Sequence, residues 1–391
     1  MQIEIEHPAA ATDLPSVGLK LAESFGFPVA DADGWFQTAG ADQVTALRID
    51  GAIVGGLIRV PHAQFFGGRS VPALGIAGVG VAPEARRTGA ARALMIETLR
   101  QARAAGVATS NLYPATHALY ESVGYGVAGT RHSARVLTSA IRVAPEPGLE
   151  IRRLTEAELP AMKALYTAHA RLRPGHLDRG PYVWVRTLRT WRDRPAYATG
   201  VFEGDRLVGY VTWRRAASEP PSDVQIGDVV APSASVARRI WGFLKDHSTM
   251  APAITGFSSP TDPFWQALSW PGPELALSHL WMLRLVDLPA AITARGYPGL
   301  VDVRVGLAVD DDVLPENAGL WTLHVQGGRG TLTRGGTPEA FLGIAALAGL
   351  FSGLLDPSVL MARGALAASD TASERLAAVF SGPAPWLPDM F

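Results

Sequence analysis

The sequence predicts a mixed α/β (α+β) protein made of three successive modules, and three observations support this class. Strand and helix signals alternate through residues 1–140. The same order of elements begins again after the Pro-Glu-Pro-Gly segment at residues 145–148, and a third set of strands and helices starts near residue 280. A chain of 391 residues has room for two or three domains of roughly 100–200 residues each. We therefore place the domains at residues 1–145, 146–277 and 278–391.

The first module is predicted to be a layered domain of strands and helices. Asp50-Gly51 separates two apolar runs and is typical of a tight hairpin turn. Residues 89–104 place Leu94, Met95 and Leu99 on one side of a helix. Strands are expected over residues 2–6, 43–49, 52–60, 74–81, 107–112 and 125–137, and helices over residues 13–25, 89–104 and 116–122.

The second and third modules follow from the same periodicities. In the second, strands are expected over residues 149–154, 197–202, 207–213 and 224–230, and helices over 156–170 and 233–247. In the third, strands are expected over 281–286, 300–309 and 320–325, a helix over 288–296 and a turn-rich stretch over 327–336. The apolar run 340–355 is shorter than the roughly 20 residues of a membrane span, so we interpret it as a buried helix.

The composition excludes several classes of protein. Hydrophobic residues make up 48% of the chain and charged residues 18%, so a disordered chain is excluded. A net charge of −1 gives no basic footprint for nucleic acid. The absence of cysteine excludes disulfides and a cysteine nucleophile, and the isolated histidines His117 and His132 predict no metal site. The start of the sequence lacks signal-peptide features, so we expect a cytoplasmic protein without membrane contact.

The strongest motif is Val-Gly-Val-Ala-Pro-Glu-Ala-Arg-Arg-Thr-Gly-Ala-Ala at residues 79–91. It joins a strand to an amphipathic helix through a turn that begins at a proline. Unpaired backbone N–H groups and the positive end of the helix dipole meet at such a turn, which favours an anion such as a diphosphate. Gly89 would let the backbone approach the anion, and Arg86 and Arg87 would add charge. The alternative is an ordinary turn between a strand and a helix.

A second motif is Tyr-Glu-Ser-Val-Gly-Tyr-Gly at residues 120–126, a short helix that leads through a glycine into a strand. With an ordinary pKa of about 10, a tyrosine keeps its proton at neutral pH and can pass it to a departing thiolate. Tyr120 is therefore a candidate general acid, and a packing role is the alternative. We expect Tyr125 to pack at the start of the strand.

The first motif resembles the acetyl-CoA motif of the GNAT superfamily of N-acetyltransferases. The resemblance implies that acetyl-CoA is the co-substrate and that the backbone of Val79 and Val81 binds its thioester and pantetheine arm. It also implies that the residues of the turn wrap the pyrophosphate: Arg86, Arg87, Gly89, Ala90 and Ala91. The Tyr120 segment resembles the GNAT segment that carries the general acid.

The second module lacks the anion motif. Its corresponding turn, residues 229–237, has no arginine three residues after Pro232 and no glycine beyond. We therefore expect a degenerate GNAT domain that keeps the fold without the phosphate site.

The complete order of modules resembles the Eis (enhanced intracellular survival) acetyltransferases. Residues 281–289 resemble the opening of the sterol-carrier-like domain found in that family, and the chain ends on an aromatic residue, which suggests a tail that docks. The resemblance implies that the α-carboxylate of Phe391 is the general base, that an aminoglycoside is the acceptor and that the protein is a hexamer. Where the family often has a Ser-Glu pair before the acid tyrosine, this chain has Ala115 and Thr116.

Three residues are candidates for contacts with the acceptor. Asp31, Asp33 and Trp35 fall where the acceptor-binding region of a GNAT domain usually lies, and carboxylates there would attract a polyamine. The alternative for these residues is a solvated acidic loop.

The leading hypothesis is an N-acetyltransferase that moves acetyl directly from acetyl-CoA to a primary amine of an aminoglycoside or similar polyamine in a ternary complex. A protein-lysine acetyltransferase and an enzyme that acetylates an amino-bearing natural product are the alternatives. A more distant alternative is a non-enzymatic lipid carrier or interaction protein with vestigial GNAT halves.

Overall fold

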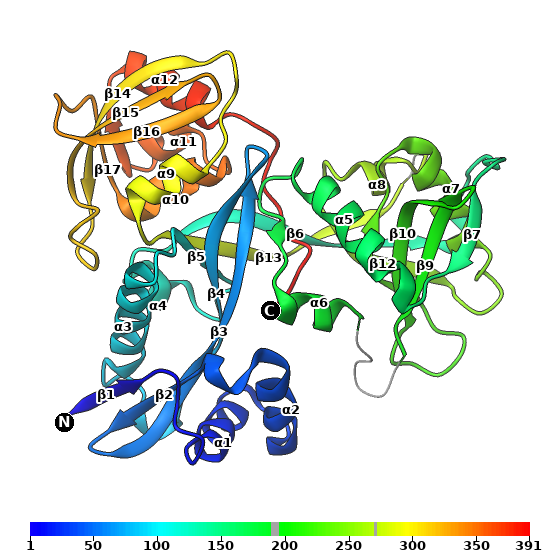
Figure 1. The fold of residues 1–391 in the computed structure, drawn as a ribbon, viewed down its shortest axis with the longest axis horizontal. Coiled ribbons are helices and arrows are strands. Elements are labelled where there is room, and N and C mark those ends of the chain that lie inside the picture. Colours follow the sequence, from blue (N-terminus) through cyan, green and yellow to red (C-terminus); the bar gives the residue numbers. More distant parts are fainter. Residues whose placement is uncertain (189–194, 270–271) are drawn as a thin grey trace.

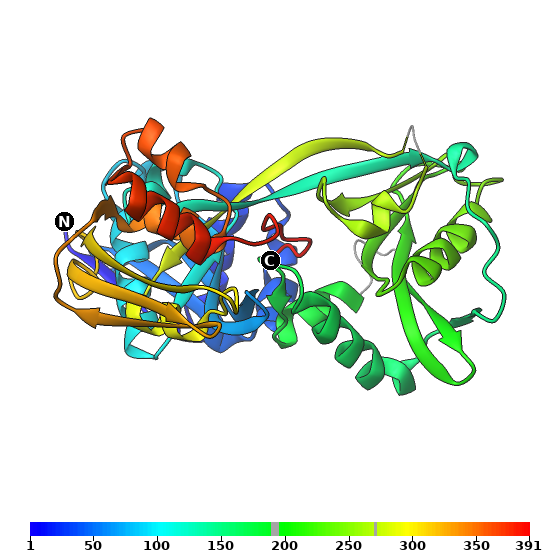
Figure 2. The ribbon, with the colours of Figure 1, turned by 90° about the horizontal axis from the view of Figure 1, so that it is seen from above.

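The computed structural model describes residues 1–188, 195–269 and 272–391. Its strands form a 13-stranded sheet and a separate five-stranded sheet, with helices packed on them, which confirms the predicted mixed α/β class. The first and third modules lie together at one end of an elongated molecule, and the second module lies at the other end (Figures 1 and 2). The carboxyl terminus lies between these two ends (Figure 1).

The first module follows the predicted order apart from one helix, Val29–Ala39, that the sequence analysis did not predict. Its turn at Asp50 and Gly51 has positive φ at both residues, 48° and 82°, as a two-residue hairpin of this type requires. Its elements are β1 (Ile3–Glu6), α1 (Leu14–Phe25), α2 (Val29–Ala39), β2 (Val44–Ile49), β3 (Ala52–Phe66), β4 (Arg69–Val81), α3 (Ala90–Ala104), β5 (Thr109–Leu112), α4 (His117–Glu121) and β6 (Gly126–Leu137). Short 3₁₀ helices lie at Ala41–Gln43, Pro83–Ala85, Thr138–Ala140 and, in the second module, Glu156–Glu158.

Strands β3 and β4 are longer than the sequence pattern predicts. They form one hairpin that reaches Phe66 and Arg69, with Gly67 and Gly68 at its tip. Pro61 follows the expected end of the first strand and Pro72 precedes the expected start of the second, yet both residues remain in the ladder. Proline weakens a strand signal in the sequence because it cannot donate a ladder hydrogen bond.

The second module repeats the arrangement with four short elements that the sequence analysis missed: Leu177–Asp178, Pro181–Leu188, Ala253–Ser258 and Pro263–Gln266. Helix α7 packs Val236, Ile240 and Trp241 into the core of this module. Its elements are β7 (Glu150–Arg153), α5 (Leu159–Ala170), β8 (Leu177–Asp178), α6 (Pro181–Leu188), β9 (Tyr197–Glu203), β10 (Arg206–Arg215), β11 (Val224–Val230), α7 (Ala234–Lys245), β12 (Ala253–Ser258), α8 (Pro263–Gln266) and β13 (Glu274–Leu285).

The first two modules share one sheet. Its strand order is β1-β2-β3-β4-β5-β13-β6-β12-β11-β10-β9-β7, so β6 and β13 run from one module into the other. Strand β13 begins at Glu274, seven residues before the expected start, and lies between β5 and β6. Residues 281–286, which we expected to open the third domain, therefore lie in the large sheet. The domain limit after residue 277 falls within β13, and the domain limits stay predictions.

The third module differs from the prediction at two points. The turn-rich stretch 327–336 contains strand β16 between two glycine pairs, and the apolar run 340–355 begins as strand β17 before it becomes a helix. The elements are α9 (Leu288–Ala294), β14 (Asp302–Asp310), β15 (Gly319–Gln326), β16 (Arg329–Arg334), β17 (Ala340–Gly343), α10 (Ile344–Ser352), α11 (Pro357–Ala362), β18 (Leu366–Ala368) and α12 (Asp370–Phe380). Within the described ranges, no helix is both long and apolar enough to cross a membrane.

The last residues of the chain leave α12 and dock against both of the first two modules. The Leu387 amide donates to the Thr130 carbonyl of β6 at 3.2 Å, and the Trp386 amide donates to the Pro174 carbonyl at 3.2 Å. The side chains of Trp386 and Leu387 are buried. The red segment in Figure 2 runs between the two ends of the molecule, so the tail brings the terminus to the junction of the modules.

Candidate active site

The centre of the first module is an opening between two parallel strands. Strands β4 and β5 pair only from Ala73 with Thr109 to Gly75 with Asn111, whereas β4 continues to Val81 on its other side with β3. Beyond Gly75, β4 has no partner in β5. The opening therefore leaves backbone groups of β4 available to a ligand.

A β-bulge lies in the unpaired part of β4. The pairs Ile58–Ala77 and Gly56–Gly80 leave two residues of β4, Gly78 and Val79, opposite one residue of β3. Gly78 has φ of 61°, which favours glycine. Bulges re-aim backbone groups and are frequent next to active sites. The bulge thus sets the direction of the Val79 amide, while Val79 and Val81 keep partly buried side chains.

The turn after β4 collects unpaired amides at the start of α3. Gly89 is the N-cap residue of α3 and provides no side-chain cap. Both Arg87 (φ 62°) and Gly89 (φ 85°) have left-handed backbones, and a Cβ at Gly89 would meet no atom within 4 Å. Among the described residues, no hydrogen-bond acceptor is found for the amides of Arg87, Thr88, Gly89, Ala91 and Arg92. Such an open helix N-terminus is suited to a phosphate group.

The predicted pyrophosphate residues lie together at this turn. The side chains of Arg86 and Arg87 are exposed, and the Arg86 Nε donates to the Val81 carbonyl at 3.4 Å. Ala90 is buried against the helix core and Ala91 is partly exposed. The turn therefore offers two cationic side chains and the positive end of a helix dipole to the same space.

The second module has no such opening at its helix. The N-cap residue of α7 is Ser233, and its hydroxyl accepts a hydrogen bond from the Val236 amide at 3.3 Å. A side-chain cap satisfies an amide that an anion would otherwise bind. The N-cap residue of α7 therefore satisfies one amide with its own side chain, whereas the N-cap residue of α3, Gly89, satisfies none.

Tyr120 lies on α4 beside the strand opening. Its side chain is buried in the hydrophobic cluster that also contains Leu74 and Ile76 of β4, and its ring meets that of Tyr125 edge-on at 5.9 Å. Its hydroxyl has no hydrogen-bond partner in the described part of the chain and is not among the buried atoms that lack one, so it keeps some accessible surface. Burial raises the pKa of Tyr120 to about 12, so the hydroxyl stays protonated at neutral pH. The Tyr125 hydroxyl, by contrast, is satisfied by Ser110 at 2.7 Å.

The tail places Phe391 at the point where β4 and β5 diverge. The Phe391 ring packs against the ring of His62 at 5.2 Å and that of Tyr113 at 6.1 Å. A Cβ on Gly75 would come within 2.8 Å of the Phe391 ring, so only glycine fits there without displacing it. Among the described residues, no ion pair is found for the terminal carboxylate of Phe391.

His62, which the sequence analysis missed, belongs to a buried chain of hydrogen bonds. The Gln64 amide donates to the Gly175 carbonyl at 2.7 Å, and the Asn111 amide donates to Gln64 Oε1 at 2.8 Å. Asn111 Oδ1 therefore accepts from His62 Nε2 at 3.0 Å, which leaves His62 Nδ1 without a proton or a partner. Burial lowers the pKa of His62 to about 4, so its ring is neutral beside Phe391. A histidine within a strand gives no sequence signal for this role.

The sequence analysis also missed the ion-pair cluster that anchors the tail. Asp389 accepts hydrogen bonds from Arg179, and Arg179 also pairs with Asp228 of β11. Arg179 attracts and hydrogen-bonds both carboxylates. Burial opposes ionisation of Asp228, but the attraction of Arg179 outweighs it and lowers the pKa of Asp228. Burial raises the pKa of Asp389 despite Arg179. Asp389 is the one charged side chain in residues 381–391. This isolated charge was the feature of the sequence that could have indicated an ion pair in the tail.

The three candidate acceptor residues lie on a helix and not in a loop. Asp31 and Asp33 are exposed on α2, and neither has an ion pair among the described residues. Trp35 is half-buried and packs against Gly78 of the bulge, and its Nε1 donates to the Tyr182 hydroxyl of α6 at 2.8 Å. Asp31 and Trp35 are four residues apart and share a helix face. Of the two carboxylates, Asp31 is thus on the face that meets the bulge.

Comparison with known proteins identifies the family. Residues 7–128 and 175–285 each match the acetyltransferase (GNAT) domain family, and residues 288–388 match the sterol carrier protein domain family. An N-acetyltransferase of Streptomyces avermitilis is 30% identical over 344 residues, which cover 83% of each chain. The chain belongs to the Eis-like GNAT N-acetyltransferases. N-acetyltransferase Eis of Mycobacterium tuberculosis is 27% identical over 330 residues, which cover 81% of this chain and 79% of that protein.

A solved structure agrees with this assignment. The crystal structure of a GCN5-related N-acetyltransferase from Anabaena variabilis matches all of both chains with a TM-score of 0.96 and 31% identity. The Eis-like chain therefore has two GNAT domains followed by a sterol-carrier-like domain, as the sequence predicted, and it is an acetyltransferase. GNAT acetyltransferases use acetyl-CoA, and the free amides of the α3 turn fit the phosphates of that donor. An enzyme is favoured over the lipid-carrier hypothesis.

The open turn at Gly89 generates a prediction about donor affinity. We expect Gly89→Val to weaken acetyl-CoA binding at least about tenfold, because the new side chain fills the space beside the free amides and strains a left-handed backbone. Isothermal titration calorimetry measures the affinity, with one site per chain in the unaltered enzyme. Gly106→Val is a matched control, since Gly106 follows the other end of α3, has φ of 75° and also faces open space. Equal affinities in the two variants would contradict the assignment of this turn to the donor.

Proposed function

We propose that this enzyme transfers acetyl from acetyl-CoA directly to a primary amine of an aminoglycoside or a similar polyamine, in a ternary complex without an acetyl-enzyme. The proposal rests on the opening between β4 and β5. The free amides at the start of α3 lie beyond one end of this opening, and Phe391 lies at the other end. The choice of an aminoglycoside rests on the resemblance to Eis acetyltransferases, of which the M. tuberculosis protein is a 27% identical relative.

The alternation of side chains along β4 supports a meeting of two substrates. Leu74 and Ile76 pack on the side of the sheet that carries α3 and Tyr120, whereas Gly75 faces the Phe391 ring on the other side. Pairing with β5 ends at Gly75, so the two sides of the sheet are connected just beyond this residue. A donor bound along the α3 side could thus present its thioester to an amine that arrives from the Phe391 side.

The proposed acetyl transfer uses three groups of the enzyme: the Phe391 carboxylate, the Val79 amide and the Tyr120 hydroxyl. The terminal carboxylate of Phe391 takes a proton from the acceptor ammonium, directly or through water, and the freed amine forms an N–C bond to the thioester carbonyl. The amide of Val79 in the bulge stabilises the oxygen that gains negative charge. The C–S bond then breaks, and Tyr120 gives its proton to the departing thiolate. After the N–C bond has formed, the nitrogen loses a second proton, which reaches Tyr120 through solvent, and the Phe391 carboxyl group releases the first proton to solvent.

The acceptor contacts are proposed on charge and position. Asp31 shares a helix face with Trp35, which lies against the bulge, so its carboxylate would attract a cationic acceptor close to the thioester. Asp33 lies two residues further along α2, on a different face, and would act at longer range. Three further parts of the proposal rest on the resemblance or on sequence pattern alone: a hexameric assembly, a cytoplasmic location and the domain limits given above.

The acceptor class is tested by a panel of amines. We expect thiol release from acetyl-CoA to be faster, by at least an order of magnitude in kcat/KM, with aminoglycosides and polyamines than with lysine peptides or monoamine natural products. The physical reason is that a polycation gains from the acidic face of α2, whereas a single amine gains less. Mass spectrometry of the products identifies the acetylated amines. A preference for lysine peptides would contradict the proposed acceptor and favour a protein-lysine acetyltransferase.

The role of Tyr120 is tested by removing one oxygen atom. We expect Tyr120→Phe to lower kcat by about 10²–10⁴-fold, the usual contribution of a general acid, while acetyl-CoA affinity changes little. Tyr125→Phe is the matched control, because it removes a hydroxyl from the same buried cluster that bonds only to Ser110. Steady-state kinetics and calorimetry separate the two effects. If Tyr120→Phe loses no more activity than Tyr125→Phe, Tyr120 is a packing residue and not the acid.

A further inference from the structure

The second domain holds the end of the chain through a buried ion-pair cluster. Arg179 Nη2 lies 2.8 Å from Asp389 Oδ1, and Arg179 Nη1 lies 2.7 Å from Asp228 Oδ2. The exposed fractions of the three side chains are only 1%, 5% and 4% for Arg179, Asp389 and Asp228. The Tyr210 hydroxyl donates to Asp228 at 2.7 Å, and the Tyr166 hydroxyl lies 3.3 Å from Asp389. One guanidinium therefore joins a strand of the second domain to a residue two positions from the terminus.

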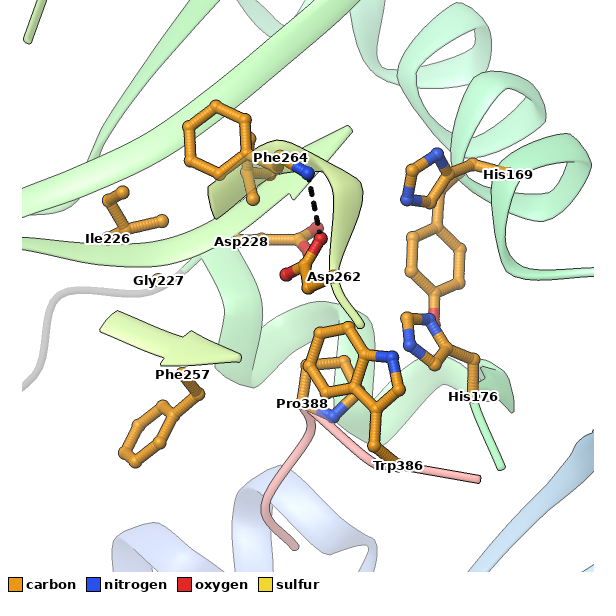
Figure 3. A pocket seen from close by; sticks show the side chains of 12 residues that line it. His169, His176, Ile226, Gly227, Asp228, Phe257, Asp262, Phe264, Trp386 and Pro388 are labelled. Atoms are coloured by element: carbon orange, nitrogen blue, oxygen red, sulfur yellow. Dashed lines mark hydrogen bonds between the residues drawn. The ribbon is translucent and has the colours of Figure 1, made fainter. Parts of the chain in front are cut away.

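This cluster lies in the second domain's own strand opening. Strands β11 and β12 pair only at Val224–Ile254 and Gln225–Thr255, and β11 then continues to Val230 paired with β10 but not with β12. A cavity lies in the opening, and its lining includes residues of both strands. Trp386 and Pro388 of the tail line the same cavity, facing Asp228 and Asp262 (Figure 3). In the first domain the corresponding opening is the proposed donor site, and in the second domain the tail occupies it.

We propose that Arg179, Asp228 and Asp389 are positioning residues, and that the second domain acts as a clamp that sets the location of the Phe391 carboxylate. This inference rests on the proposed function, in which that carboxylate is the general base. It gives the second GNAT domain a task in the reaction although its α7 turn is capped by Ser233. The clamp acts on the terminal carboxylate and touches neither substrate.

The geometry of the tail explains how a clamp at Asp389 can control the terminus. Only Met390 separates Asp389 from Phe391, so the chain has little freedom between the ion pair and the carboxylate. The Tyr113 hydroxyl lies 3.0 Å from the Leu387 carbonyl and 2.9 Å from the Asp389 carbonyl, which fixes the backbone of the same segment. A bidentate ion pair adds direction to these contacts, because the planar guanidinium accepts a carboxylate in few orientations.

The cluster can be opened from the tail side without leaving an unpaired charge in the second domain. In Asp389→Ala, Arg179 keeps its bidentate pair with Asp228, and Asp228 keeps Tyr210. The test compares four full-length enzymes: the unaltered chain, Asp389→Ala, a chain extended by two glycines after Phe391, and the combination. The extension displaces the carboxylate directly, whereas Asp389→Ala releases its anchor.

We expect Asp389→Ala to lower kcat about 10²-fold, the scale of loss when a reacting group is misplaced by about 1 Å, with the KM for acetyl-CoA nearly unchanged. The extension should lower kcat at least as much. In the extended chain, Asp389→Ala should add less than about a twofold change, because a clamp has no further effect once the carboxylate is displaced. Asp389→Asn keeps an oxygen acceptor for Arg179 and should recover part of the lost kcat.

A structural readout and a matched control accompany the kinetics. Hydrogen exchange should show faster exchange at the Trp386 and Leu387 amides in Asp389→Ala and unchanged exchange in β11, since only the tail is released. The control is Asp370→Asn, which neutralises an exposed carboxylate of the third module, the module that also contains Asp389. It should alter neither hydrogen exchange nor kcat.

Three results would overturn the inference in distinguishable ways. An unchanged kcat in Asp389→Ala, with a large loss in the extended chain, would show that the clamp does not position the base. Equal loss from Asp389→Ala in both backgrounds would show that Asp389 acts on a substrate and not through Phe391. An unchanged kcat in the extended chain would refute the proposed base itself, and the clamp proposal with it.

Discussion

The buried guanidinium of Arg179 connects the second domain to the C-terminal tail and, through the tail, to the strand opening of the first domain. Our account of the function depends on these three parts. Removing charges from water is costly, and a buried ion pair is stable only when its remaining donors and acceptors are also satisfied. Arg179 meets this condition: its Nε and both terminal nitrogens bond to Asp389 and Asp228, and its Cζ lies 3.7 Å from the centre of the Tyr166 ring. Such a cluster fixes one arrangement of the tail, and that arrangement carries Phe391 to the strand opening of the first domain. The position of the terminus is therefore set by the second domain, about 200 residues away along the chain.

The two GNAT domains show how one fold supports two different tasks. Both have a pair of parallel strands that diverge, and a helix that starts where the first of these strands ends. In the first domain the helix begins at Gly89, whose missing side chain leaves amides free for a phosphate. In the second it begins at Ser233, whose hydroxyl satisfies an amide. The two turns thus differ in their N-cap residue and in the arginines that precede it, while the surrounding layers remain the same. The shared strands β6 and β13 then hold the two domains in a fixed relation within one sheet.

Local sequence patterns predicted much of the fold and part of the candidate site, because those features depend on neighbouring residues. The Asp50-Gly51 turn and the open start of α3 at Gly89 follow from backbone preferences that act over a few residues. The insertion of β13 between β5 and β6, by contrast, pairs segments about 140 to 180 residues apart, and an apolar strand does not reveal its partner. The roles of Arg179 and His62 were missed for the same reason, since each becomes meaningful only through contacts with distant residues. The apolar run that begins at Ala340 has residues suited to either a strand or a helix, and pairing with β14 decides its first four residues.

The central claim is that the α-carboxylate of Phe391 is the group that removes the proton from the acceptor amine. The most direct measurement is the kcat of a semisynthetic enzyme in which this carboxylate is a carboxamide, compared with an identically ligated enzyme that ends in the natural carboxylate. The substitution keeps the Phe391 ring in its contact with His62 and Gly75 and leaves the Asp389–Arg179 pair intact, so only the terminal charge changes. Our account predicts a loss of about 10²-fold or more in kcat at pH 7, the scale of general base catalysis, with unchanged affinity for acetyl-CoA. A carboxamide enzyme that turns over at the rate of its carboxylate counterpart would contradict it.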